Sequence, residues 1–320
     1  MIFVAGSANL DFVVRAAHIP APGETVLGRD FVTFPGGKGA NQAVACARAG
    51  GAATEMLLAL GQDAQAAVIE ASLRDAGVTL HLVRDQHQAT GCAFICVSDD
   101  AENAITVAPG ANQSLRPQHL PALSSASHLM LQLETPVFTV IAYAKAARTQ
   151  GVQVVLNAAP AKALNTAQAT EAAAELLSLV DLLIVNEGEL AVVAGVVANQ
   201  HTVAECLARI DVPRVVVTLG PHGSCARVDG KVFLQPAYPV KAVDTTAAGD
   251  TFCGALVAAL DRQLDFAQAL VQASAAAALA CARPGAQASI PTQKEVQAFL
   301  QGQPSATPAR QAELVRLAGF

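Results

Sequence analysis

The sequence feature that most constrains the fold is a repeated alternation of short apolar segments with helical patterns. One such pair is TEMLLALG followed by DAQAAVIEASLRDAG, and another is HLMLQLE followed by TPVFTVIAYAKAARTQG. Both helical segments end in a glycine, Gly77 or Gly151, as a helix with a left-handed cap does. Strand-helix-strand repeats predict an α/β fold with three layers, in which helices cover both faces of a parallel sheet.

Two stretches, residues 10–34 and 90–112, interrupt this alternation with a period-two pattern of apolar and polar residues and with turn signals. We expect them to form antiparallel strands that pair into a small second sheet, a β lid that projects from the main sheet. The interpretation therefore divides the chain into three parts. They are a nucleotide- and substrate-binding core (1–9, 35–89 and 113–301), the lid (10–34 and 90–112) and a C-terminal tail (302–320).

The last third of the chain adds a hairpin, a long helix and the tail. The segment SCARVDGKVFLQP predicts a hairpin that turns at Asp229-Gly230, and the alanine-rich run from Phe266 to Ala282 predicts a helix. The tail begins as a Pro/Ser linker and finishes as a short amphipathic helix. We expect it to be a loosely docked appendage.

Composition excludes several classes of protein. A net charge of -6, no tryptophan and no basic cluster argue against a nucleic-acid-binding surface. The absence of a long uninterrupted apolar run and of a basic N-terminal region predicts no membrane span and no secretory signal, so we expect a cytoplasmic protein. Seven scattered cysteines without a C-x-x-C pair indicate free thiols and no zinc site. The expected partner is a small molecule.

The segment VDTTAAGDTF places small residues directly before a predicted helix. Ala247, Ala248 and Gly249 let backbone N–H groups approach a ligand, and a helix start favours an anion. Asp250 alone would be interpreted as an ordinary helix-start carboxylate. Beside a phosphate it would repel, unless it takes the proton from a hydroxyl group that attacks that phosphate. Asp250 is therefore the candidate general base.

The segment FPGGKGANQA is a second glycine-rich entry into a helix. It is not a P-loop, because Gly39 follows Lys38 where that motif needs serine or threonine. Gly37 and its glycine neighbours would let the main chain approach a polar ligand, to which Asn41 offers an amide. A purely structural turn has nearly equal weight, and Lys38 among glycines favours a functional role.

Further polar groups follow the ends of other predicted strands, where open α/β sheets bind ligands. They are Asn9 and Asp11 in GSANLD, Glu134 in QLE, Asn186 and Glu189 in NEGE, and Gly220 and Gly223 in VTLGPHG. GSANLD lacks the glycine spacing of a dinucleotide fingerprint. Capping and tight turns explain each group singly, whereas four such clusters at strand ends are hard to attribute to capping alone.

Taken together, these motifs resemble those of the ribokinase-like carbohydrate kinases, also called the PfkB family. The resemblance rests on GGKGANQAVACARAG and VDTTAAGDTFCGAL, joined in the family's order by GSANLD, QLETP, NEGE, VTLGPHG and RPGAQASIP. It covers about the whole chain up to Leu300. It implies a ribokinase-like fold and an ATP-dependent sugar kinase that phosphorylates the 5-hydroxyl of D-ribose.

The resemblance also implies a role for each matching residue. Asp250 is the base, and Ala247, Ala248 and Gly249 form an anion hole. The implied sugar contacts are Asn9, Asp11, Gly37, Lys38, Gly39, Asn41 and Glu134. The implied nucleotide contacts are Asn186, Thr218, Gly220, Gly223, Ala248, Gly249 and Ser274. Glu189 organises magnesium, and a potassium site is implied at Asp244, Thr246, Ala280, Arg283, Gly285 and Ser289.

The family comparison leaves several points open. Ala247 replaces a more common glycine, which is tolerable if its φ is negative. The alternative functions are a kinase for another small sugar or nucleoside (2-deoxyribose, a ketohexose or an adenosine-like substrate) and a catalytically silent sugar-binding regulator. The unpaired edge of the lid predicts a homodimer that forms through the lid strands.

Overall fold

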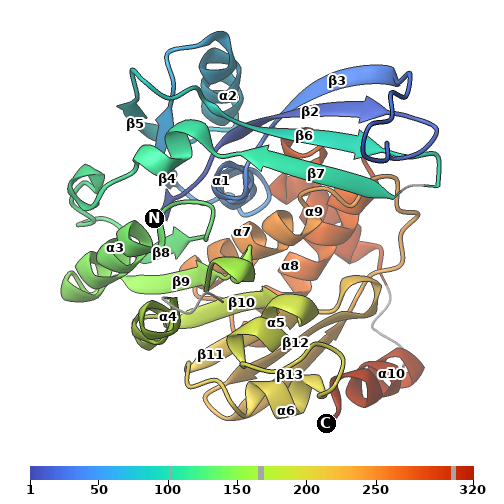
Figure 1. Cartoon of the computed structure of the whole chain (residues 1–320). Helices are drawn as coiled ribbons and strands as arrows, with labels where there is room; N and C mark the ends of the chain where they lie inside the picture. Colours follow the sequence, from blue (N-terminus) through green and yellow to red (C-terminus); the bar gives the residue numbers. More distant parts are fainter. Residues whose placement is uncertain (101, 165–168, 304–307) are drawn as a thin grey trace.

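The computed structural model describes residues 1–100, 102–164, 169–303 and 308–320, which form a large sheet and a small sheet (Figure 1). The large sheet has nine strands in these residues, of which the seven from β11 to β5 are parallel and the two at the other edge are antiparallel. In sheet order they are β13 (Lys231–Pro236), β12 (Gly223–Val228), β11 (Arg214–Thr218), β10 (Leu182–Asn186), β9 (Gln153–Asn157), β8 (His128–Leu131), β1 (Ile2–Ala5), β4 (Thr54–Leu60) and β5 (Thr79–Arg84).

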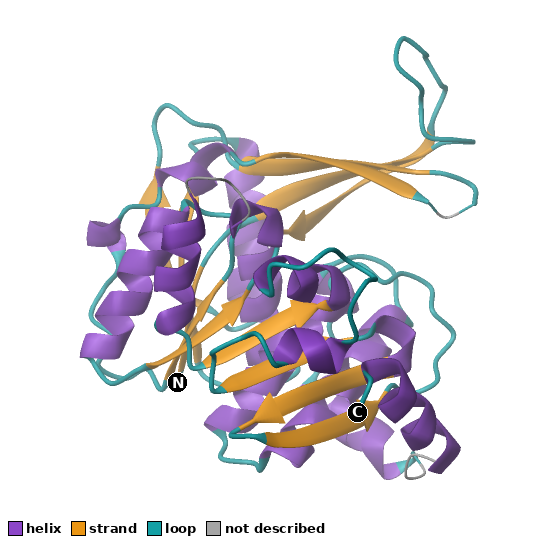
Figure 2. Ribbon diagram, turned by 60° about the horizontal axis from the view of Figure 1, so that its bottom comes forward, coloured by secondary structure: helices purple, strands orange, loops and turns teal. Residues whose placement is uncertain are grey.

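Helices cover both faces of this sheet (Figure 2). Successive strand residues point to opposite faces, so that Ile2 and Val4 join one apolar cluster while Phe3 and Ala5 join the other. The predicted three-layer α/β fold is confirmed. The first helical layer contains α1 (Lys38–Arg48), α2 (Ala64–Asp75), α7 (Ala248–Asp261), α8 (Phe266–Cys281) and α9 (Gln293–Gln301). The second contains α3 (Val137–Thr149), α4 (Ala169–Ser178), α5 (Glu187–Val193) and α6 (Val203–Leu207).

Local sequence signals predicted several of these elements. The glycines that follow α2 and α3, Gly77 and Gly151, have φ values of 83° and 72°, as left-handed helix caps require. Asp229 and Gly230 form the turn between β12 and β13, with φ values of 48° and 80°. The expected alanine-rich helix is α8.

The small sheet projects from the core with the strand order β3-β2-β6-β7 (Figure 1). Its strands are β2 (Asn9–Arg15), β3 (Arg29–Gly36), β6 (Gly91–Val97) and β7 (Asn103–Ala108). The predicted second sheet is therefore present. Its two outer pairs are antiparallel as expected, while β2 and β6 run parallel because they come from separate excursions of the chain. The exact boundaries between core, lid and tail stay an interpretation.

The tail ends in α10 (Pro308–Ala318), which packs on β13 and α6. Leu314 and Ala318, one helical turn apart, are buried in the apolar cluster of the second helical layer. Gln311 also donates a hydrogen bond to the carbonyl of Leu234 at 3.4 Å. The expectation of a loosely docked helix is therefore wrong. The predicted linker at residues 304–307 lies outside the described residues.

The seven cysteines are free thiols. Within the described residues, no group of three or more His, Cys, Asp or Glu side chains is arranged to hold a metal ion. No helix in this part of the chain has the length and hydropathy needed to cross a membrane.

Candidate active site

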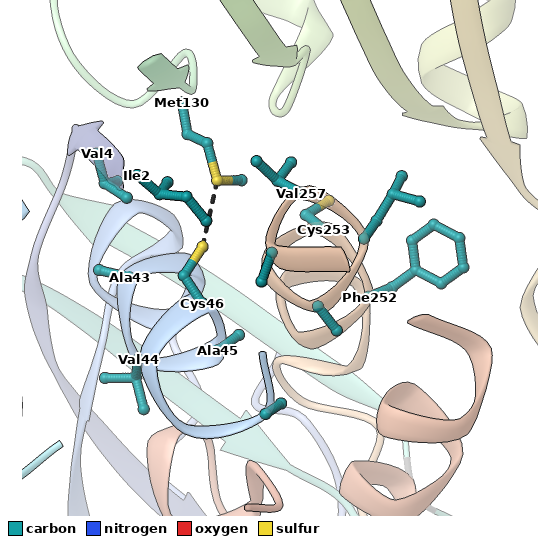
Figure 3. Packing of buried hydrophobic residues seen from close by; sticks show 14 of the residues in the cluster. Ile2, Val4, Ala43, Val44, Ala45, Cys46, Met130, Phe252, Cys253 and Val257 are labelled. Atoms are coloured by element: carbon teal, nitrogen blue, oxygen red, sulfur yellow. Dashed lines mark hydrogen bonds between the residues drawn. The ribbon is translucent and has the colours of Figure 1, made fainter. Parts of the chain in front are cut away.

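Helices α1 and α7, which carry the two glycine-rich motifs, pack against each other in the core (Figure 3). The contact is close because small residues line it: a Cβ atom added to Gly254 would lie 2.5 Å from the Cβ of Ala45. Cys46 and Met130 fill the neighbouring space, with 3.4 Å between their sulfur atoms. This packing brings the N-terminal ends of both helices together at one edge of the sheet.

Asp250, in the first turn of α7, is held by two amide side chains of α1. Asn41 Nδ2 donates to Asp250 Oδ2 at 3.0 Å, and Gln42 Nε2 donates to Asp250 Oδ1 at 2.9 Å. Burial raises the pKa of Asp250, while the charge of Lys38 and the two amide hydrogen bonds lower it, and the net direction is upward. The carboxyl group is thus fixed in place, with a balance of opposing effects on its charge.

Lys38 is surrounded by acidic groups from several elements. Burial lowers its pKa, but the negative charges of Asp250, Glu134 and Glu189 raise it above the ordinary value. A lysine held cationic in this way can neutralise negative charge on a bound ligand. Lys38, Glu189 and Asp250 also line one cavity of about 160 Å³.

Glu134 follows β8 and connects two of the predicted motifs. Its Oε2 accepts hydrogen bonds from Ser7 Oγ at 2.5 Å and from the backbone N–H of Lys38 at 3.1 Å. The N–H of Gly39 donates to Ser7 Oγ at 3.3 Å. Glu134 therefore ties the start of α1 to the segment after β1.

Asp11 lies on β2 and is buried. Its pKa is raised to about 7 by burial first, and then by the negative charges of Glu134 and Asp250, against the opposing effect of Lys38. A carboxyl group whose pKa is raised by burial and by neighbouring charges is typical of a functional site. Asp11 thus belongs to the same electrostatic cluster as Asp250.

Gly37 meets a backbone requirement at the start of α1. Its φ is 88°, and a Cβ atom there would lie 2.7 Å from the backbone nitrogen of Asn9. The Asn9 side chain is itself bonded within the protein, because its Oδ1 accepts from Asn112 Nδ2 at 2.8 Å. Asn112 also bonds both backbone groups of Ala8, which fixes the segment below the lid.

Ala247 precedes α7 with a φ of 58°, in the left-handed region. The condition stated above, a negative φ, is not met. An alanine in this conformation costs about 1–2 kcal/mol. The turn places the start of α7, including Ala248 and Gly249, beside the 160 Å³ cavity and a second cavity.

A larger cavity of about 620 Å³ lies on the other side of Gly249. Its volume is in the range of ligand pockets. Of the predicted nucleotide residues, Thr218, Gly220, Gly223, Ala248, Gly249 and Ser274 line it. Thr218 and Gly249 also line the 160 Å³ cavity with Asn186, so the predicted nucleotide residues occupy one continuous region.

Asn186 and Glu189 form a capping box at the start of α5. Asn186 Oδ1 accepts from the N–H of Glu189 at 2.8 Å, and Glu189 Oε2 accepts from the N–H of Asn186 at 2.9 Å. The capping explanation is therefore correct for these bonds. Burial raises the pKa of Glu189, and the charge of Lys38 opposes it. A carboxylate facing the cavity suits a magnesium-water cluster.

The predicted cation residues lie on two loops that Asp244 joins, except for Ala280, which lies in the last turn of α8. Its Oδ1 accepts from the N–H of Thr246 and its Oδ2 from the N–H of Gly285, both at 2.9 Å. These hydrogen bonds outweigh burial and lower the pKa of Asp244. The Ser289 hydroxyl donates a hydrogen bond to the carbonyl of Ala286. The backbone N–H of Arg283 donates to the Ala280 carbonyl, and the Arg283 side chain donates to Glu295. An ionised carboxylate among loop carbonyls fits a monovalent cation.

The sequence interpretation missed the amide residues behind Asp250. Gln42, Gln132 and Asn157 form a buried hydrogen-bonded chain that reaches the carboxyl group. Gln42 stands beside Asn41 inside a motif already singled out, which is the one signal that pointed to it. Gln132 follows β8 and Asn157 is the last residue of β9, and their convergence depends on the sheet order.

Comparison with known proteins places the chain in a family. The family described as "pfkB family carbohydrate kinase" matches residues 1–293 of this chain, so α10 lies beyond the matched region. Ribokinase from Haemophilus influenzae is 38% identical over 307 residues, which cover 93% of this chain and 97% of the relative.

Two solved structures support the same relationship. The ribokinase from Thermotoga maritima superposes with a TM-score of 0.83 at 34% identity, and covers 94% of this chain and 99% of that one. The Arabidopsis thaliana ribokinase complexed with ribose and ATP has a TM-score of 0.81 at 32% identity, with coverage of 94% and 99%. The chain therefore belongs to the pfkB family of carbohydrate kinases and is an ATP-dependent sugar kinase.

Proposed function

We propose that this kinase transfers the γ-phosphoryl group of ATP to the 5-hydroxyl of D-ribose, to give D-ribose 5-phosphate and ADP. The observation that carries the proposal is the position of Asp250. Two amides hold its carboxyl group at the start of α7, next to a nucleotide-sized cavity and within the charge field of Asp11 and Lys38. The similarity to curated ribokinases supports ribose as the sugar.

In this proposal Asp250 accepts the proton of the 5-hydroxyl group while the oxygen of that hydroxyl group forms a bond to the γ-phosphorus. The bond from that phosphorus to the β–γ bridging oxygen breaks, and ADP leaves. Asp250 must be ionised to act, and Lys38 and the amides of Asn41 and Gln42 favour the ionised form. The protein contributes mainly position and charge, since phosphoryl transfer requires little covalent chemistry from side chains.

The remaining groups take roles according to where they lie. Backbone N–H groups of Ala247, Ala248 and Gly249 would form the anion hole for the migrating phosphoryl group, because a helix start is a positive dipole end. The N–H of Ala248 donates to the Thr245 carbonyl at 3.2 Å and would share its hydrogen with the phosphoryl group. The sugar contacts are Asn9, Asp11, Gly37, Lys38, Gly39, Asn41 and Glu134. The nucleotide contacts are Asn186, Thr218, Gly220, Gly223, Ala248, Gly249 and Ser274.

Two ions complete the proposed site. Glu189 would hold magnesium through water, and magnesium would neutralise charge on the nucleotide phosphates. A potassium ion at Asp244, Thr246, Ala280, Arg283, Gly285 and Ser289 would make the anion hole more electropositive. The ionised Asp244 between its two loops supports that position. We further infer that the protein is a homodimer and that it is cytoplasmic. The free thiols support a reducing compartment such as the cytoplasm.

The test is a panel of D-ribose, 2-deoxyribose, ketohexoses and nucleosides, assayed for ADP formation with ATP and magnesium. We expect the highest kcat/KM with D-ribose, because a 2-deoxy sugar leaves a polar group of the site unpaired. Asp250→Asn, which keeps the shape of the side chain, should abolish turnover while calorimetry still detects sugar binding. Preference for another substrate would replace ribose, and an active Asp250→Asn enzyme would refute the role of Asp250.

A further inference from the structure

We propose that Gln42 is a positioning residue that fixes the orientation of the Asp250 carboxylate. The inference rests on the proposed role of Asp250 as the base and adds a residue to that site. It is based on a chain of buried amides that runs from Gln132 through Gln42 to Asp250, with Asn157 as a side branch.

Other protein groups engage both the N–H bonds and the oxygen of the Gln42 side chain. It lies in α1 with 0% of its surface exposed. Its Nε2 donates to Asp250 Oδ1 at 2.9 Å and to Asn157 Oδ1 at 3.1 Å, which uses both N–H bonds. Its Oε1 accepts from Gln132 Nε2 at 2.6 Å. No donor of Gln42 is therefore left for a substrate.

The direction of the Gln42 amide is set by its neighbours. Asn157 Nδ2 donates to the carbonyl of Ile184 at 3.2 Å, so the Asn157 oxygen is the atom that faces Gln42. A flipped Gln42 amide would place its oxygen against two acceptors, Asn157 Oδ1 and Asp250 Oδ1. The backbone of β10 therefore fixes, through Asn157, which end of Gln42 faces Asp250.

Gln132 has one unsatisfied buried oxygen, and its hydrogen bond to Gln42 gives a reason for its presence. Its Oε1 is buried and lacks a hydrogen-bond partner among the described residues. An unsatisfied buried acceptor destabilises a protein. The same amide donates to Gln42 Oε1 and so reinforces the direction of the Gln42 amide toward Asp250.

Asn41 and Gln42 differ in what they leave open. Each donates to one oxygen of Asp250, but Asn41 Oδ1 is buried without a hydrogen-bond partner in the described structure, so the protein leaves its acceptor capacity unused. Gln42 has no such atom. Loss of Asn41 should therefore weaken sugar binding, whereas loss of Gln42 should affect turnover alone.

Charged and titratable groups from several elements act on Asp250, so the amides work within a larger field. These groups are Asp11 on β2, Lys38 on α1, Glu134 after β8, Glu189 on α5 and Cys253 on α7. The hydrogen bond from Gln42 lowers the pKa of Asp250 against burial. Removing it should move the acid limb of the rate profile to higher pH.

The experiment compares Gln42→Met and Gln42→Glu with the wild-type enzyme in kcat, both KM values and the pH profile of kcat. Gln42→Met should lower kcat on the order of 10- to 100-fold, the effect of losing a hydrogen bond to a charged group. Both KM values should stay within about two-fold of wild type. The acid limb should move upward, and further in Gln42→Glu, because two adjacent carboxyl groups share a proton.

Thr139→Val is the matched control, since it removes a buried hydrogen bond of α3, to the Leu115 carbonyl, away from the site. It should leave kcat and the pH profile unchanged. If Gln42→Met does not fold, Gln132→Met tests the same chain and should shift the profile in the same direction.

An unchanged kcat and pH profile in the variants, with an inactive Asp250→Asn enzyme, would overturn this inference alone. A raised sugar KM at constant kcat would also overturn it, because Gln42 would then bind substrate. An active Asp250→Asn enzyme would instead refute the proposed function itself. The sugar used is whichever member of the panel the wild-type enzyme prefers.

Discussion

At the scale of single residues, the candidate site concentrates acidic side chains around one lysine. Asp11, Glu134, Glu189 and Asp250 come from four separate segments of the chain and interact electrostatically with Lys38. Gathering like charges in a buried pocket destabilises the fold, and such a cost is typical of functional sites. The arrangement therefore predicts stability differences that depend on pH.

Asp11→Asn should stabilise the protein at alkaline pH. The pKa of Asp11 is about 7 in the folded protein, against an ordinary value of 3.8, so its favourable contribution is complete below the ordinary value and is lost as pH rises from there through 7. Relative to wild type, the variant should gain on the order of 2 kcal/mol more at pH 8 than at pH 5. Urea unfolding at both pH values measures this. An equal difference at both would contradict the raised pKa.

The same variant should bind sugar poorly, because the substitution replaces one acceptor oxygen of the carboxylate by an NH2 group, which cannot accept a hydrogen bond from a sugar hydroxyl. We expect the sugar KM to rise at least about ten-fold while the KM for ATP stays near wild type. A stability gain with unchanged sugar KM would separate the electrostatic cluster from sugar binding.

Ala247→Gly should stabilise the protein, because alanine is strained at a φ of 58° and glycine is not. We expect a gain of about 1 kcal/mol, or roughly 2 °C in the thermal midpoint. Ala248→Gly is the control at the next position, in helical backbone, and should lose about 0.5–1 kcal/mol. Equal effects of the two substitutions would contradict the assigned backbone conformation.

At the scale of elements, α10 is an integral part of the second helical layer although it lies beyond the family match. Leu314 is 1% exposed, whereas Leu317, less than one turn later, is 43% exposed. Arg310 on the same helix lines the 620 Å³ cavity and donates to the Ala237 carbonyl at 3.2 Å. The helix thus supports one wall of that cavity.

Leu314→Ala should destabilise the protein by about 2–3 kcal/mol, since it removes a buried side chain and leaves a cavity. Leu317→Ala, an exposed leucine of the same helix, should change the stability by less than about 0.5 kcal/mol. Chemical denaturation of both variants measures the difference. Equal small effects would show that α10 docks loosely after all.

At the scale of the whole molecule, the two faces of the lid differ in how their apolar side chains are used. On one face Phe12 stacks with Phe31 and Phe94, at centroid distances of 6.2 and 5.4 Å. The other face carries Ile105 and lines a cavity of about 440 Å³ between the lid and the loops around Asp244 and Gly285. Ile105 is 55% exposed and lies on β7, an edge strand of the lid, so it is our candidate for contact with a second copy.

Ile105→Asp should therefore convert the proposed homodimer to a monomer in sedimentation velocity. Phe94→Asp is matched in exposure, at 54%, and lies on the opposite face, so it should leave the dimer intact. Dissociation by Phe94→Asp alone would assign the interface to the aromatic face. A monomeric wild-type protein would refute the dimer.

The sequence could predict features that depend on local patterns. The caps at Gly77 and Gly151, the turn at Asp229-Gly230 and the two motifs around Lys38 and Asp250 all depend on residues close together in the chain. It could not predict that β2 and β6 pair in parallel, because that pairing joins separate segments. The φ of Ala247 and the amide chain behind Asp250 were also beyond reach, since both depend on tertiary packing.

The close packing of α1 against α7 has a consequence for substitutions outside the lining of the cavities. Gly254 and Ala45 set how near the two helices lie, and the same helices present Gln42 and Asp250 about one turn away. A methyl group at Gly254 would push the helices apart and lengthen the contacts at the catalytic end. Variant libraries designed to change the reaction rate should therefore include the contact between Gly254 and Ala45 as well as the residues that line the pocket.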